Sequence, residues 1–149
     1  MRTITKKKLA EPVPDVLRSR GLRLTNPRRL ILEIVRATDV HPTALWVYQR
    51  ARRRAPRVSL GTVYRNLRGL TNEGLLKEMA DGRGLGRFDG NLSDHCHVVC
   101  VSCGRISDLA ESLDRSLESR VAARTGFTVS HHRVEFYGRC PDCVGKRRR

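Results

Sequence analysis

The sequence is poor in aromatic side chains, in acidic residues and in long apolar runs. Aromatic residues make up 5% of its 149 residues, so the core has to be small and aliphatic, or the fold needs a cross-link of another kind. A run of about 18 apolar residues is missing, which excludes a transmembrane helix. The basic N-terminus, residues 1–8, leads into no apolar segment like that of a secretory signal. We therefore expect a cytoplasmic protein without a membrane partner.

Basic residues outnumber acidic residues by 30 to 15, which gives a formal net charge of +15. The excess is concentrated at one end of the chain. We place a domain boundary in the glycine-rich stretch 81–86 and expect two domains, residues 1–84 and residues 85–149. The first domain holds 19 Lys and Arg against 7 Asp and Glu, and the second holds 11 against 8. Such a basic first domain is typical of a protein that binds a polyanion, nucleic acid above all.

Cysteine is absent from the first 95 residues, and all five cysteines lie further on. An odd, clustered set in a reducing compartment indicates metal binding rather than a disulfide framework. Four of them form two Cys-x-x-Cys pairs, Cys100 with Cys103 and Cys140 with Cys143. Each pair falls at an expected strand end or turn, where both thiolates can face one ion. Four thiolates suit a structural zinc ion that joins the end of the chain to a sheet.

Apolar residues of the first domain recur at helical spacing. The pattern predicts four helices, near residues 13–20, 26–35, 44–54 and 60–72. In the third of these we expect Leu45, Tyr48 and Ala51 to form the buried stripe. Two short strands, residues 75–79 and 87–89, follow the last helix. Three helices and then a hairpin are the order of a winged helix-turn-helix, whose last helix enters the major groove of DNA.

The second domain alternates between short strands and one helix. Strands are predicted at residues 97–100, 105–109, 127–129 and 133–137, with a helix marked by apolar residues from Leu109 to Val121. A small unit with exposed strand edges and a thin core is typical of a dimerisation module. The predicted fold is α+β: a winged helix-turn-helix domain followed by a small α/β dimerisation domain with a four-cysteine zinc site.

A second group of potential ligands centres on His95, Cys96 and His97. In a strand, residues i and i+2 share one face, so both imidazoles can point the same way while Cys96 faces the opposite side. Asp89 lies six residues earlier and Asp108 eleven residues later. Histidine and carboxylate ligands suit a divalent ion such as Fe(II) or Mn(II). The spacing alone does not assign His41, which lies between the second and third helices.

These residues and motifs resemble the ferric uptake regulator (Fur) family of metal-dependent bacterial repressors over residues 13–143. The segments that carry the resemblance are Leu22-Arg23-Leu24-Thr25-x-x-Arg28, His41-Pro42-Thr43-Ala44, Thr62-Val63-Tyr64-Arg65-Asn66-Leu67, Arg87-Phe88-Asp89, His95-x-His97-x-x-Cys100-x-x-Cys103-Gly104, and His132-Arg133-Val134-Glu135-x-Tyr137-Gly138-x-Cys140-x-x-Cys143.

The resemblance implies a homodimer that binds a palindromic operator in double-stranded DNA. It implies structural Zn²⁺ on the four paired cysteines. It also implies a regulatory Fe(II) or Mn(II) site between the two domains, with the ligands His41, Asp89, His95, His97 and Asp108. The DNA-contacting residues that it suggests are Thr62, Tyr64, Arg65, Arg68 and Arg28.

Two positions favour the peroxide-sensing (PerR) branch of this family. Position 108 is Asp as in that branch, where iron sensors usually have Glu, and position 89 is Asp, where zinc sensors tend to have Cys. In the peroxide-sensing branch, bound Fe(II) reacts with hydrogen peroxide, and the radical attacks a ligand histidine, here His41 or His95. The oxidised ring is a poor ligand and the repressor leaves its DNA. Because this switch is consumed rather than turned over, we do not expect an enzyme.

Three other interpretations remain open. An iron- or zinc-responsive repressor of the same family shares nearly every motif. A zinc-ribbon thiol redox enzyme using Cys96 is disfavoured by the charge and helix order of the first domain. A basic interaction module stapled by zinc leaves the histidine and aspartate residues unexplained.

Overall fold

The structure, a computed structural model, describes residues 11–81, 84–109, 111 and 113–145. These residues divide into an N-terminal unit, up to Leu92, and a C-terminal unit, from Ser93 onwards. The division lies eight residues beyond the boundary predicted after Gly84. The reason is that the second strand of the hairpin pairs with the first and so stays in the N-terminal unit. The basic end segments 1–10 and 146–149, and residues 82–83 of the glycine-rich stretch, lie outside the described residues.

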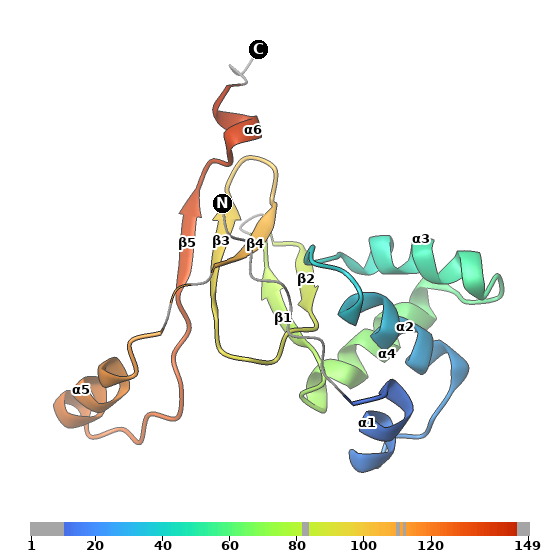
Figure 1. The fold of residues 1–149 in the computed structure, drawn as a ribbon, viewed down its shortest axis with the longest axis horizontal. Coiled ribbons are helices and arrows are strands. Elements are labelled where there is room, and N and C mark those ends of the chain that lie inside the picture. Colours follow the sequence, from blue (N-terminus) through green and yellow to red (C-terminus); the bar gives the residue numbers. More distant parts are fainter. Residues whose placement is uncertain (1–10, 82–83, 110, 112, 146–149) are drawn as a thin grey trace. The chain divides into compact units, whose positions relative to one another are not determined.

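The described part of the N-terminal unit consists of helices followed by a hairpin (Figure 1). Its elements are α1 (Val13–Ser19), α2 (Asn26–Arg36), α3 (Ala44–Arg54), α4 (Leu60–Asn72), β1 (Lys77–Ala80) and β2 (Gly86–Asp89). Hydroxyl side chains set where three of the helices begin. Thr25, Thr43 and Ser59 each accept a hydrogen bond from the backbone N–H three residues later. The four predicted helices and the hairpin are therefore present in the predicted order.

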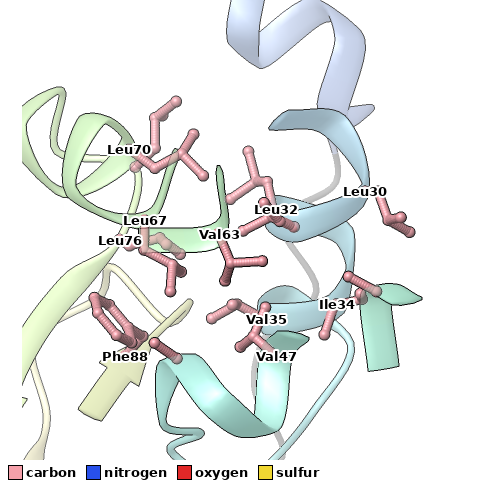
Figure 2. Packing of buried hydrophobic residues seen from close by; sticks show 14 of the residues in the cluster. Leu30, Leu32, Ile34, Val35, Val47, Val63, Leu67, Leu70, Leu76 and Phe88 are labelled. Carbon is pink, nitrogen blue, oxygen red and sulfur yellow. The ribbon is translucent and has the colours of Figure 1, made fainter. Parts of the chain in front are cut away.

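The core of the N-terminal unit lies between α2, α3 and α4, and Phe88 of β2 also packs there (Figure 2). Val63, Leu67 and Leu70 of α4 are buried. The predicted stripe of α3 was wrong in part: Leu45 is 52% exposed, and the buried residues are Ala44, Val47 and Ala51. Ala44 faces the core. Residues three and seven positions later lie on the same face of a helix, so Val47 and Ala51 are buried with it.

The C-terminal unit is a small sheet with one longer helix (Figure 1). Its elements are β3 (Cys96–Cys100), β4 (Ile106–Leu109), α5 (Ser116–Thr125), β5 (Glu135–Gly138) and α6 (Pro141–Val144). The strand order is β4-β3-β5, in which β3 runs antiparallel to β4 and parallel to β5. The short helix α6 was not predicted, although Pro141 at its first position is a common sign of a helix start.

Two predictions for the C-terminal unit were wrong. Residues 127–129 are not a strand, and Phe127 is 74% exposed, directly after the left-handed Gly126 that ends α5. The described sheet has the order β4-β3-β5, and this segment pairs with none of these strands. The helix begins at Ser116 rather than near Leu109, because Leu109 is the last residue of β4.

In the described ranges, no helix combines the length and the hydropathy that a bilayer-spanning segment needs.

Candidate metal centres

The two Cys-x-x-Cys pairs come together in the C-terminal unit. Each of the four cysteines offers a sulfur atom within 4.8 Å of the other three sulfurs. Cys100 is the last residue of β3, and Cys103 lies in the turn that leads to β4. Cys140 precedes α6 and Cys143 lies within it. Four sulfurs gathered in this way match the closed, tetrahedral ligand set of structural zinc.

The parallel pairing of β3 and β5 explains why the two pairs meet. Cys100 is in register with Gly138, so β3 and β5 finish at the same end of the sheet. Each strand continues directly into its Cys-x-x-Cys turn. The backbone N–H of Cys140 donates to the Cys100 sulfur at 3.3 Å, which already links the two turns.

The four thiols lie in different electrostatic environments. The pKa of Cys100 is lowered to about 5 because the backbone N–H groups of Cys140 and then of Cys103 donate to its sulfur. The pKa of Cys143 is raised to about 12, mainly by its hydrogen bond with the Cys140 side chain and by burial. Neighbouring thiols do not all ionise in each other's company, so a bound cation has to supply the compensating charge.

A second group of ligand atoms lies on β3, on β4 and on the residue directly before β3. His97 stands opposite Asp108 in the antiparallel register, and its Nε2 lies 3.7 Å from Asp108 Oδ1. The Nε2 of His95 lies 3.4 Å from the same oxygen. All three side chains are buried, and the two imidazole rings are 4.3 Å apart between centroids. The sequence prediction that His95 and His97 point the same way is confirmed.

A further pair of ligand atoms lies in the N-terminal unit. His41 is in the connection between α2 and α3, and Asp89 is the last residue of β2. Their side chains are fully buried, with His41 Nε2 at 3.8 Å from Asp89 Oδ2. The other oxygen of Asp89 accepts the backbone N–H of Asn91 at 2.8 Å, which fixes the orientation of the carboxylate. The sequence did not place His41, and the fold brings it next to Asp89.

Each of the two groups has ligand atoms that suit a divalent cation. Imidazole nitrogens and carboxylate oxygens suit Fe(II), Mn(II) or Zn(II), whereas a soft site would be built from sulfur. In the C-terminal unit, Nδ1 of His95 lies 2.8 Å from the carbonyl oxygen of Ser93, a contact that orients the ring while Nε2 lies near Asp108. The buried aspartates supply negative charge that an ion would neutralise.

Cys96 is on the opposite face of β3, as the alternation predicted. It is 2% exposed, and its Sγ lies 3.7 Å from the carbonyl oxygen of Glu111, beside Leu117 and Phe136. A buried thiol that faces away from both histidines has neither the base nor the access that a nucleophile needs. This geometry disfavours the thiol-enzyme interpretation.

The outer face of α4 carries the residues proposed for DNA contact. Tyr64, Arg65 and Arg68 are exposed, opposite the buried apolar residues, and the helix contains no acidic residue. Thr62 is half-buried, and its hydroxyl interacts with Ser59 and Arg65. Arg28 lies elsewhere, on α2, where its guanidinium donates to the carbonyl oxygen of Arg23 at 2.7 Å.

Two charged residues near His41 were not identified from the sequence. Asp81 is fully buried, and its Oδ2 lies 3.1 Å from Nη2 of Arg87. Arg87 was noted only as part of a motif, and Asp81 only as the start of the glycine-rich stretch 81–86. The period-2 alternation of β2, which places Arg87 on the same face as Asp89, was the signal that could have linked Arg87 to the site.

Comparison with known proteins gives a consistent result. The model of the ferric uptake regulator family matches residues 19–137. The chain is 41% identical to the peroxide operon regulator of Bacillus subtilis, over 89% of this chain and 91% of that protein. The ferric uptake regulator of Pseudomonas aeruginosa, solved with manganese, superposes with a TM-score of 0.71 at 28% identity, covering 88% of this chain and 99% of that one. PerR from Streptococcus pyogenes superposes with a TM-score of 0.51 at 31% identity, covering 89% and 93%.

Proposed function

The chain belongs to the ferric uptake regulator family, and from this premise we propose that it is a metal-dependent transcriptional repressor that senses hydrogen peroxide through Fe(II). The observation that carries the proposal is the β3–β4 register, which sets Asp108 opposite His97 and beside His95 in a buried cluster of ion ligands. The relative in Bacillus subtilis is named for a peroxide operon, and the Streptococcus pyogenes PerR structure is described as a basis for peroxide sensing.

The N-terminal unit binds DNA. We assign base contacts to Arg65 and Tyr64 on α4, with Thr62, Arg68 and Arg28 as flanking contacts. The arrangement of α3, α4 and the hairpin supports this assignment, as does the excess of basic residues before position 84. Because the protein acts as a dimer, its operator is palindromic, with one half-site for each N-terminal unit.

The four-cysteine cluster holds structural zinc. It joins the ends of β3 and β5 in a unit that buries little apolar surface. The zinc ion therefore supplies stability that a larger hydrophobic core would otherwise provide. Zinc held by four thiolates requires reduced cysteines, which supports a location in the reducing cytoplasm. The exposed Phe136 and Tyr137 on β5 provide apolar surface for the dimer interface.

The regulatory ion is bound jointly by the two units. The pair His41 and Asp89 offers two ligands, and the group on β3 and β4 offers three, so neither set alone is a complete Fe(II) or Mn(II) site. An ion that needs both sets favours the arrangement in which they converge. This differential affinity is the free energy that couples metal binding to the placement of the DNA-binding units.

Sensing follows from what oxidation does to the ligands. When Fe(II) is bound, its reaction with hydrogen peroxide supplies a radical oxidant at the site. His41 and His95 are the residues that we expect to take up an oxygen atom, and an oxidised imidazole is a poor ligand. With the ligand set broken, the two units separate from their DNA-binding arrangement and repression ends.

Operator binding against metal concentration tests the proposal. A duplex selected from random sequence by the Mn(II)-loaded, zinc-replete protein serves as the operator. We expect His41→Ala to abolish Mn(II)-dependent binding to this duplex while the zinc content is unchanged. The control is His131→Ala, because His131 is exposed and lies outside both ligand groups. Unchanged operator affinity in His41→Ala would contradict the assignment.

The assignment of Arg65 has its own test. If Arg65 contacts a base through two hydrogen bonds, Arg65→Ala weakens operator binding by about 1–3 kcal/mol. Binding to random DNA should change much less. An equal loss of affinity for the operator and for random DNA would show that Arg65 contacts only a phosphate.

A further inference from the structure

The hairpin is attached to the segment that carries His41. The backbone N–H of Phe88 donates to the carbonyl oxygen of Pro42 at 3.0 Å. One residue earlier, Nη1 of Arg87 donates to the carbonyl oxygen of His41 at 3.4 Å. Strand β2 therefore holds the backbone at residues 41–42 through two consecutive carbonyl groups, one bound by a backbone N–H and one by a side chain.

The Arg87 side chain is itself fixed by the buried carboxylate of Asp81. Its Nη2 lies 3.1 Å from Asp81 Oδ2, and only 18% of the Arg87 side chain is exposed. The other oxygen, Asp81 Oδ1, accepts the backbone N–H of Leu85 at 3.1 Å, and the Asp81 N–H donates to the Leu85 carbonyl. A carboxylate held from both sides in this way gives the guanidinium a defined position.

The same strand carries the second ligand of this group. Arg87 and Asp89 are two residues apart and share one face of β2, while Phe88 between them points into the core. The separation of 3.8 Å between the His41 and Asp89 side chains is therefore set where β2 contacts the His41 backbone. Arg87 is the side chain that spans this contact.

We propose that the Asp81–Arg87 pair is a positioning device that holds His41 in place for metal binding and links the ion to the hairpin. The proposal rests on the regulatory site proposed above. Groups behind metal ligands orient them, and their loss weakens metal binding. Because linkage is reciprocal, an ion that holds His41 and Asp89 also restrains the hairpin, which is the wing of the DNA-binding unit.

The test is Mn(II) titration of the full-length, zinc-replete protein and its variants. Arg87→Gln should weaken Mn(II) binding by about 10- to 100-fold. Asp81→Asn should act in the same direction, and the double variant should be little weaker than Arg87→Gln, because the two residues act as one unit. Arg87→Lys keeps the charge but not the fork of donors, so its affinity should lie between wild type and Arg87→Gln.

The matched control is Arg18→Gln. Arg18 forms an ion pair with Asp15 at 2.9 Å in the same unit, but both side chains are more than half exposed. Its loss should leave Mn(II) affinity unchanged. Thermal unfolding of every variant reports loss of fold, and if Arg87→Gln does not fold, Arg87→Lys takes its place.

Two measurements distinguish positioning from general stability. The electron paramagnetic resonance spectrum of bound Mn(II) should change in Arg87→Gln. Hydrogen exchange of the hairpin amides should slow on Mn(II) binding in wild type and slow less in the variant. Wild-type affinity, spectrum and exchange in a folded Arg87 variant would overturn the proposal. If wild-type protein itself shows no His41-dependent Mn(II) binding, the proposed function fails instead.

Discussion

The N-terminal and C-terminal units are stabilised by different kinds of interaction. In the N-terminal unit, α1 to α4 and Phe88 contribute to one aliphatic cluster with many fully buried side chains. In the described C-terminal unit, the buried apolar side chains are Val99, Ile106, Cys96 and Cys100, and α5 buries none of its ten residues. A unit with so little core depends on its zinc ligands and on its dimer partner.

The two metal centres also have different roles. The four-cysteine centre lies within one unit and supports its fold. In the function proposed above, the regulatory ion takes ligands from both units, so it would act on their arrangement rather than on either fold.

Loss of zinc should have the largest effect, and it should be confined to one unit. Cys140→Ser removes one of four ligands, and zinc binding stabilises small zinc domains by on the order of 10 kcal/mol. We expect hydrogen exchange to become fast throughout residues 93–145 and to stay slow in the helices of the N-terminal unit. Cys96→Ser is the control, because Cys96 lies outside the cysteine cluster and should leave zinc bound. Uniform unfolding of both units in Cys140→Ser would contradict the claim that zinc stabilises only the C-terminal unit.

A cavity in the aliphatic core should give the converse result. Leu67 of α4 is fully buried, so Leu67→Ala should destabilise the N-terminal unit by about 2–5 kcal/mol. The zinc content of the C-terminal unit should not change. Leu45→Ala, at a half-exposed position on α3, should change the free energy of unfolding by less than about 0.5 kcal/mol. Denaturant unfolding followed by Trp46 fluorescence measures both variants.

Two glycines should respond to alanine with opposite signs. A Cβ atom at Gly90 would lie 3.1 Å from Arg36 Cα and 3.2 Å from the Val35 carbonyl oxygen, which are backbone atoms that cannot move aside. Gly90→Ala should therefore destabilise the N-terminal unit by about 1–3 kcal/mol. Gly69 lies in α4 with open space around it, so Gly69→Ala should stabilise by about 0.5–1 kcal/mol. A stabilising Gly90→Ala would show that the end of β2 does not pack tightly on α2.

A lost helix cap should have the smallest effect. The Ser59 hydroxyl accepts the backbone N–H of Thr62 at 3.1 Å at the start of α4. Ser59→Ala should cost about 1 kcal/mol in the thermal unfolding of the N-terminal unit. Arg115, before α5, makes no such cap, so Arg115→Ala should leave the C-terminal unit unchanged. Unchanged stability in Ser59→Ala would contradict a capping role for this hydroxyl.

The sequence predicted those features that depend on local pattern. The four helices of the N-terminal unit, its hairpin and the two Cys-x-x-Cys turns are encoded within short stretches of sequence, and the structure confirms them. The α3 stripe was misassigned because Leu45 was taken as the inward residue in place of Ala44, and the structure turns Leu45 outward.

Long-range pairing was beyond the sequence pattern. The parallel pairing of β3 with β5, which brings the cysteine turns together, joins segments about forty residues apart. The contact between Arg87 and the His41 carbonyl spans 46 residues. His41 was included as a ligand through the family resemblance, and only the fold places it beside Asp89.

Peptide mass spectrometry after peroxide treatment tests the proposed function most directly. Zinc-replete protein is loaded with either Fe(II) or Mn(II), exposed to dilute hydrogen peroxide and digested. The account predicts one added oxygen atom on the peptides that contain His41 or His95, with iron and not with manganese. Unmodified His41 and His95 peptides from protein with iron demonstrably bound would contradict peroxide sensing and leave a regulator that responds to the metal alone.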